Sequence, residues 1–156
     1  MEQIAVDAGG VRVHVRGLSG RDELQLTDAP GEMRRLVSRL LPDGHRGASP
    51  DVEELTIAQR DRIVASLWGH TYGDVILATH RCSACTEPYD LSFSLAQLVE
   101  SLWDRPCPPD VVELAADGCA RLRDGTSVRA ATGADEAAVG GLPLEQAGAA
   151  LQARFV

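Results

Sequence analysis

One short motif occurs twice in this 156-residue chain, once near each end. The segment Val15–Glu23 (VRGLSGRDE) recurs as Val128–Glu136 (VRAATGADE), with Arg, a hydroxyl residue, Gly, Asp and Glu at matching places. Each copy follows residues typical of a strand and precedes residues typical of a helix. We therefore predict a duplicated strand–cap–helix unit. The two copies are followed by unequal lengths of sequence, a layout that favours an assembly or interaction protein over an enzyme.

Acidic residues occupy the same place in both copies. Ser19 precedes Asp22–Glu23, and Thr132 precedes Asp135–Glu136. A hydroxyl followed three residues later by a carboxylate approximates a capping box, and acids in the first turn interact favourably with the helix dipole. We interpret both acidic pairs as helix-capping residues rather than catalytic carboxylates.

Hydrophobic periodicity and capping signals predict an α+β fold, in which small strand hairpins pack with helices. The expected strands cover residues 4–7, 11–15, 75–78, 89–93, 111–114 and 126–129. The expected helices cover about 21–26, 31–41, 56–68, 95–103 and 143–155, with an exposed loop at 42–50.

Two of these helices have clear apolar faces. In the helix of residues 31–41, the apolar face consists of Met33, Leu36, Val37, Leu40 and Leu41. In the helix that begins at Thr56, the expected buried stripe is Ile57, Ile63, Val64, Leu67 and Trp68. Its expected solvent-facing residues are Gln59, Arg60, Asp61 and Arg62.

A proline-rich segment at 106–110 divides the chain, because proline neither continues a helix nor allows one just before it. We expect a main α+β domain at 1–105, a linker at 106–110, and a partial repeat of the N-terminal strand–helix unit at 111–156. The Ala- and Gly-rich stretch 137–153 has little bulk for a core of its own. We expect it to pack against a partner or the first domain.

Composition excludes several classes of function. The net charge is −8 and all fifteen basic residues are arginines, which disfavours binding to nucleic acid. No segment approaches the roughly 20 apolar residues needed to span a bilayer, so direct membrane insertion is not expected. The N-terminal residues lack the features of a signal peptide. We therefore expect a cytoplasmic protein, whose four cysteines are reduced or bind metal.

Cys82 and Cys85 lie between two expected strands, in the arrangement of a zinc knuckle. Zinc in such sites takes four ligands, so two more are needed. Weaker candidates for these are His80, Cys107 and Cys119. Thr86 stands where a knuckle usually has glycine, whose positive φ relaxes the turn.

Three interpretations of the cysteine pair stay open. The first is a zinc site. The second is a knuckle whose thiols are free or whose ligand set is completed by another subunit. The third is a redox pair, which is disfavoured because the cysteines lie on a hairpin and not at a helix N-terminus, where a thiol pKa is lowered.

No pattern in the chain supports an enzyme. The phosphate-binding, dinucleotide-binding, zinc-protease and nucleophile-elbow motifs are all absent from the sequence. His14, His45 and His70 have no Ser, Cys or Asp placed to form a triad. We expect no catalytic residues and no cofactor other than zinc.

The order of the motifs resembles the phage T4-type baseplate protein family of contractile phage tails and related bacterial contractile injection systems. The segments that carry the resemblance are Gly17–Glu23, Gln59–Arg62, Thr71–Asp74, Arg81–Cys85, Asp90–Phe93 and Val128–Glu136. The resemblance implies a non-catalytic baseplate component or assembly factor. Its partners would be hub, spike, wedge or tube proteins, and it would be present in several copies per particle, in the cytoplasm of the producing cell. The alternative is a small zinc-ribbon adaptor in another complex.

Overall fold

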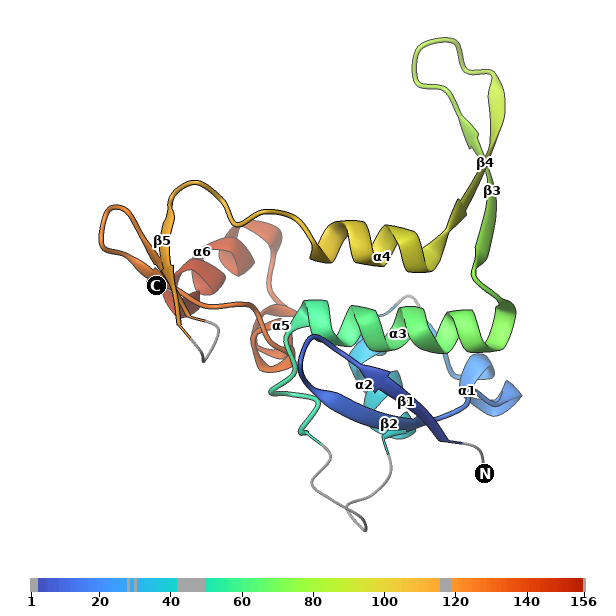
Figure 1. Cartoon of the computed structure of the whole chain (residues 1–156), viewed down its shortest axis with the longest axis horizontal. Helices are drawn as coiled ribbons and strands as arrows, with labels where there is room; N and C mark the ends of the chain where they lie inside the picture. Colours follow the sequence, from blue (N-terminus) through green and yellow to red (C-terminus); the bar gives the residue numbers. More distant parts are fainter. Residues whose placement is uncertain (1–2, 28, 30, 42–49, 116–118, 156) are drawn as a thin grey trace.

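The computed structural model describes residues 3–27, 29, 31–41, 50–115 and 119–155, and it confirms the α+β class (Figure 1). The expected loop at 42–50 lies outside the described residues, except for Pro50. The elements, in chain order, are β1 (Gln3–Asp7), β2 (Arg12–Arg16), α1 (Gly20–Leu24), α2 (Glu32–Leu40), α3 (Ile57–Tyr72), β3 (Val75–Arg81), β4 (Pro88–Ser94), α4 (Leu95–Trp103), β5 (Val111–Leu114), β6 (Ala120–Leu122), β7 (Ser127–Val128), α5 (Gly133–Val139) and α6 (Leu144–Phe155).

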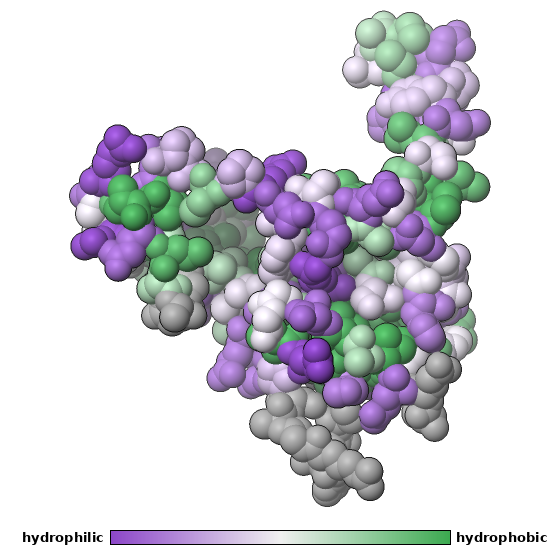
Figure 2. Space-filling model, viewed as in Figure 1, coloured by the Kyte–Doolittle hydropathy of each residue, from purple (hydrophilic) through white to green (hydrophobic). Residues whose placement is uncertain are grey.

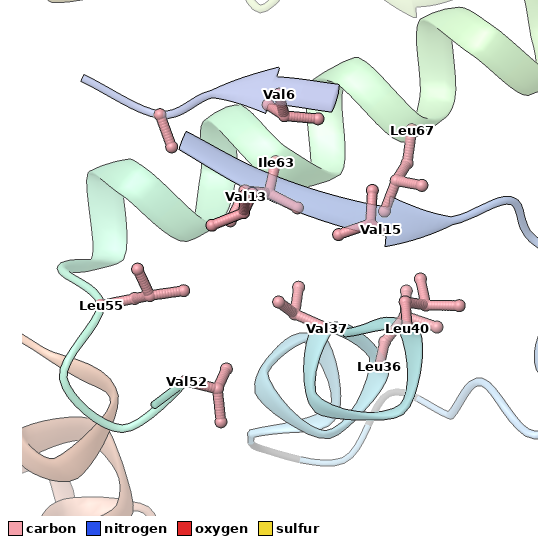
Figure 3. Close-up of a cluster of buried hydrophobic side chains, with 11 residues drawn as sticks. Val6, Val13, Val15, Leu36, Val37, Leu40, Val52, Leu55, Ile63 and Leu67 are labelled. Atoms are coloured by element: carbon pink, nitrogen blue, oxygen red, sulfur yellow. The ribbon is translucent and has the colours of Figure 1, made fainter. Parts of the chain in front are cut away.

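The core lies between the β1–β2 hairpin and the helices α2 and α3 (Figure 3). In the hairpin, Ile4 pairs with Val15 and Val6 pairs with Val13, so that one face is apolar. The buried side chains of the core are Val6, Ala8, Val13, Val15, Leu36, Val37, Leu40, Val52, Leu55, Ile63 and Leu67. Each large aliphatic side chain contributes about 1.5–3 kcal/mol by leaving water.

The expected apolar stripe of α3 is confirmed in part. Ile63 and Leu67 are buried, and Val64 packs against the core. Trp68 was expected to be buried but is 43% exposed, because its ring packs on the exposed ring of Tyr72, at 4.6 Å between centroids, rather than in the core cluster. The N-terminus of α3 has the expected capping box.

The expectation that Arg60 faces water is wrong. Arg60 is only 7% exposed, and its guanidinium forms an ion pair with Glu136 of α5. A buried charge is tolerated only with a partner, and this partner comes from the second copy of the repeated motif. The ion pair therefore joins α3 to the C-terminal part of the chain.

The first repeated unit is organised by a bidentate ion pair. Arg16, at the end of β2, donates to the two carboxylate oxygens of Asp22 in α1, at 2.7 Å each. The backbone N–H and hydroxyl of Ser19 also donate to Asp22, at 3.0 and 2.6 Å. The hydrogen bonds from Arg16 hold the pKa of this buried carboxyl well below its ordinary range.

The second unit repeats these contacts at the equivalent residues. Arg129, after β7, donates to the carboxylate oxygens of Asp135 at 2.6 and 2.8 Å. The backbone N–H and hydroxyl of Thr132 donate to the same carboxylate, at 3.0 and 3.1 Å. The two units thus share the same contacts among arginine, aspartate and cap residue, and both aspartates have the predicted capping role.

The second unit contacts the segment that leads into α3. The backbone N–H of Ile57 donates to the carbonyl of Ala131 at 2.9 Å, and that of Gly133 donates to the carbonyl of Leu55 at 3.1 Å. Thr56 and Thr132, the two cap residues, form an antiparallel bridge. Main-chain hydrogen bonds therefore attach the second unit to the segment that leads into α3.

The Ala- and Gly-rich stretch packs mainly within the second unit. Helix α6 contacts α5, and Arg154 donates from Nε to Asp135 at 2.7 Å. The Phe155 ring lies 5.5 Å from the Arg129 guanidinium. The end of α6 thus adds a second arginine to the carboxylate that organises its own unit.

Gly133→Ala is expected to weaken the attachment of the second unit. A Cβ at Gly133 would lie 2.7 Å from the carbonyl oxygen of Val52 and 3.2 Å from the Cα of Glu53, so backbone must move. We expect the free energy of unfolding by urea to fall by about 1–3 kcal/mol.

The matched control is Gly20→Ala, at the equivalent position of the first copy. A Cβ there meets nothing within 4 Å, so this variant should be as stable as the wild type. Equal losses in both variants, or no loss in either, would contradict the described attachment.

Candidate functional site

The β3–β4 hairpin, residues 75–94, projects from the body of the molecule (Figure 1) and is called the arm below. In the described part of the chain, β3 and β4 pair only with each other. Leu77 is 77% exposed and Val75 is 62% exposed, and Figure 2 shows hydrophobic surface at the base and tip of the arm. An isolated two-stranded hairpin is at best marginally stable in water, so this surface is suited to covering by another molecule.

The strand register divides the arm into two faces, because directly paired residues of antiparallel strands lie on the same face. The first, called the apolar face, consists of Ile76, Ala78, His80, Tyr89, Leu91 and Phe93. The opposite face consists of Val75, Leu77, Thr79, Arg81, Pro88, Asp90, Ser92 and Ser94. On the apolar face, Tyr89 is 45%, Leu91 41% and Phe93 37% exposed. The apolar face is therefore partly covered by its own cross-strand pairs.

Cys82 and Cys85 lie in the turn at the tip of the arm. Hydrogen bonds from the backbone amides of Cys85 and Ala84, and from the Cys85 side chain, lower the pKa of the Cys82 thiol. The backbone N–H of Thr86 donates to the carbonyl of Cys82 at 2.9 Å and closes the turn. Backbone amides directed at a cysteine sulfur stabilise a thiolate, which is the form that binds metal.

Thr86 adopts the conformation that the missing glycine would adopt. Its φ is 63°, and it is the one residue other than glycine with a positive φ in the described chain. A β-branched residue is strained there by about 1–2 kcal/mol. The hydroxyl of Thr86 donates to the carbonyl of Cys85 at 2.6 Å and offsets part of this strain. The knuckle turn therefore forms although its usual glycine is absent.

The weaker ligand candidates do not join the pair. His80 lies on the apolar face, where its ring contacts Tyr89 edge-on at 5.7 Å between centroids. Cys107 is exposed in the segment after α4, and Cys119 is half-buried next to β6. Among the residues that the structure describes, no group of three or more His, Cys, Asp or Glu side chains is placed to hold a metal ion.

Asp74 fixes the base of the arm. Its carboxylate accepts hydrogen bonds from the hydroxyl of Ser94 and, at 2.7 Å, from the backbone N–H of Ala96. Its carbonyl accepts from the N–H of Leu95 at 2.9 Å. The hydrogen bonds from Ser94 and Ala96 lower the pKa of Asp74. Asp74, which precedes β3, thus caps α4, which follows β4. This contact sets the orientation of the arm relative to α4.

The other end of α4 is attached to the body. The Trp103 ring lies against Gly9 in the β1–β2 turn, where a Cβ would come within 2.0 Å of it. Arg62 of α3 lies 4.8 Å from the centre of the Trp103 ring and forms an ion pair with Glu100. Helix α4 is therefore attached at both ends and connects the arm to the core.

The sequence did not identify Asp74, Arg60 or Gly133 as key positions. For Asp74, the available signal was a lone acid directly before an apolar strand, but its partner Ser94 lies at the far end of the hairpin. For Gly133, the signal was that both copies of the motif have glycine at this position. The sequence does not indicate that Gly133 lies against residues 52–53 whereas Gly20 has no such neighbour.

Comparisons with known proteins gave no relatives. No family model, curated protein or solved structure matches this chain. In the described ranges, no helix is long and apolar enough to cross a membrane.

Asp74→Ala should loosen the arm without unfolding the core. Because the pKa of Asp74 is lowered in the folded protein, its carboxylate stabilises the folded state at neutral pH. This stabilisation is lost as the pH falls below about 4. We expect backbone order parameters of residues 77–92 below about 0.6 in the variant at pH 7, with the core unchanged.

The control variant is Asp90→Ala, since the Asp90 carboxylate accepts a hydrogen bond from the hydroxyl of Thr79, on the neighbouring strand of the arm. It should leave the order at the base of the arm unchanged. An arm as rigid in Asp74→Ala as in the wild type would show that Asp74 does not fix it.

Proposed function

We propose that this protein is a non-catalytic structural or assembly component of the baseplate of a contractile injection system. It would act in the cytoplasm of the producing cell through contacts with hub, spike, wedge or tube subunits. The observation that carries the proposal is the arm, a projecting hairpin on which five large apolar side chains stay 37–77% exposed in the described chain. Burial of such a surface is the main driving force of protein association.

The attachment of the arm to the body through α4 supports the same function. Asp74 ties the base of the arm to α4, and Trp103 packs the far end of α4 on the β1–β2 turn. Preorganised contacts lose less conformational entropy on binding than flexible ones. The motif order in the sequence supplies the link to baseplates.

The charged residues near the arm have structural partners. An open groove between α3 and α4 is lined by Arg62, Asp74 and Glu100 among others. Arg62 pairs with Glu100, and Asp74 caps α4. These three charges are thus engaged in holding the structure, which favours a scaffold over an enzyme.

Deletion of the gene should leave sheath and tube subunits expressed but yield no complete particles. A double variant, Leu91→Ser with Phe93→Ser, should reproduce this loss because it removes the centre of the apolar face. The variant must keep the wild-type unfolding transition of the core, measured by circular dichroism.

The matched control is Ser92→Ala, at an exposed polar residue on the opposite face of the arm that is not part of its hydrophobic surface. Particles counted by electron microscopy should be normal in this control. Normal particles in the deletion strain would refute the proposed function. Normal particles in the double variant alone would refute the role of the apolar face.

A second candidate function is a zinc-ribbon adaptor in another complex, favoured by the amides directed at Cys82. If this second function is right, contractile particles form normally without this protein. The double variant Cys82→Ser with Cys85→Ser should then abolish binding of the protein to the other complex.

A further inference from the structure

We propose that the tip of the arm is one half of a four-thiolate zinc site, which Cys82 and Cys85 of a second copy of this chain complete. This inference shares with the proposed function only the assumption that the arm contacts another molecule. It concerns the partner and the cofactor of the tip, whichever particle the protein serves.

The tip has the backbone of a metal-binding turn. Amides of Ala84 and Cys85 donate to the Cys82 sulfur, and the N–H of Cys82 donates to the carbonyl of Glu87 at 3.0 Å. Thr86 keeps a positive φ at an energetic cost. A turn that needed only to reverse the chain would not require the strained residue or the amides directed at sulfur.

The ligand set at the tip is incomplete. Zinc in structural sites takes four ligands in a tetrahedron, and Cys82 with Cys85 supplies two. Of the described residues, no third metal-binding side chain gathers with this pair. We infer that another molecule supplies the remaining ligands.

A second copy supplies the missing ligands with the fewest further requirements. Its tip carries the same two cysteines, and a two-fold axis through the ion would give four equivalent sulfurs. Most protein dimers have this kind of symmetry, in which one surface contacts its own copy. Because the arm projects from the body, two tips can approach while the bodies stay apart (Figure 1).

Charge makes such a pairing depend on the metal. Each chain carries a net charge of −8, so two copies repel one another without the ion. On binding, each thiol releases its proton, and four thiolates with Zn²⁺ leave a charge of about −2 at the site. The amides at Cys82 offset part of this charge, as does Arg81, whose guanidinium donates to the Thr86 carbonyl at 3.3 Å.

The test is zinc content and oligomeric state of the full chain. Purified protein, kept reduced, is titrated with zinc ions alone and examined by elemental analysis and sedimentation velocity, and then again with excess EDTA. We expect one zinc per two chains, a dimer with zinc, and a monomer after EDTA. Cobalt in place of zinc should give the visible absorption of a tetrahedral thiolate site.

Cys82→Ser and Cys85→Ser, singly, should abolish both zinc retention and the dimer. Both residues lie in the tip turn, outside the core, so the variants should fold; circular dichroism checks this. Cys107→Ser is the matched control, because it removes an exposed cysteine elsewhere in the chain, and it should behave as the wild type.

Three results would overturn the inference: one zinc per monomer, a dimer that survives EDTA and both substitutions, or no retained zinc. The proposed function can fail separately. Normal particles in the deletion strain would leave a zinc-linked dimer intact, and a zinc-free monomer would leave the requirement for the arm in particle assembly intact.

Discussion

The bidentate ion pair between a strand-end arginine and a first-turn aspartate is the interaction on which both halves of the fold depend. In Arg16–Asp22 and Arg129–Asp135, two nearly parallel hydrogen bonds join the end of a strand to the start of a helix. Both aspartates are buried, so a lone carboxylate there would be costly. Their lowered pKa values keep both pairs ionised at neutral pH, and their contribution to stability is lost progressively as the pH falls below about 4, where the aspartates of the unfolded chain take up protons.

From these two units the structure extends to the arm through a short series of contacts. The second unit is attached to the segment before α3 by Gly133 and to α3 itself by Arg60. Helix α3 holds α4 through Arg62, and Asp74 fixes the arm to α4. The described chain thus forms a body from which the arm projects (Figure 1). This arrangement explains how a small protein with few aromatic residues keeps apolar side chains of the arm exposed.

Features set by local sequence were predictable, and features set by distant partners were not. The capping boxes and the repeated unit follow from residues only three to six positions apart, as in Arg16 and Asp22. The burial of Arg60 depends on Glu136, which is 76 positions away, and helical periodicity places Arg60 among polar neighbours. The knuckle was recognisable from Cys82 and Cys85. The projection of the hairpin that carries it depends on how Asp74 and Ser94 meet, which no spacing rule indicates.

The central claim is that this protein works by holding its arm against neighbouring subunits. The most direct test is a photo-reactive amino acid placed at Leu91 in the producing cell, with the same probe at His14, an exposed residue of the body, as control. The account predicts that crosslinking from position 91 captures a hub, spike, wedge, tube or second copy of this chain within particles, and that position 14 does not capture the same subunit. No crosslink from position 91 in cells that assemble particles would contradict it.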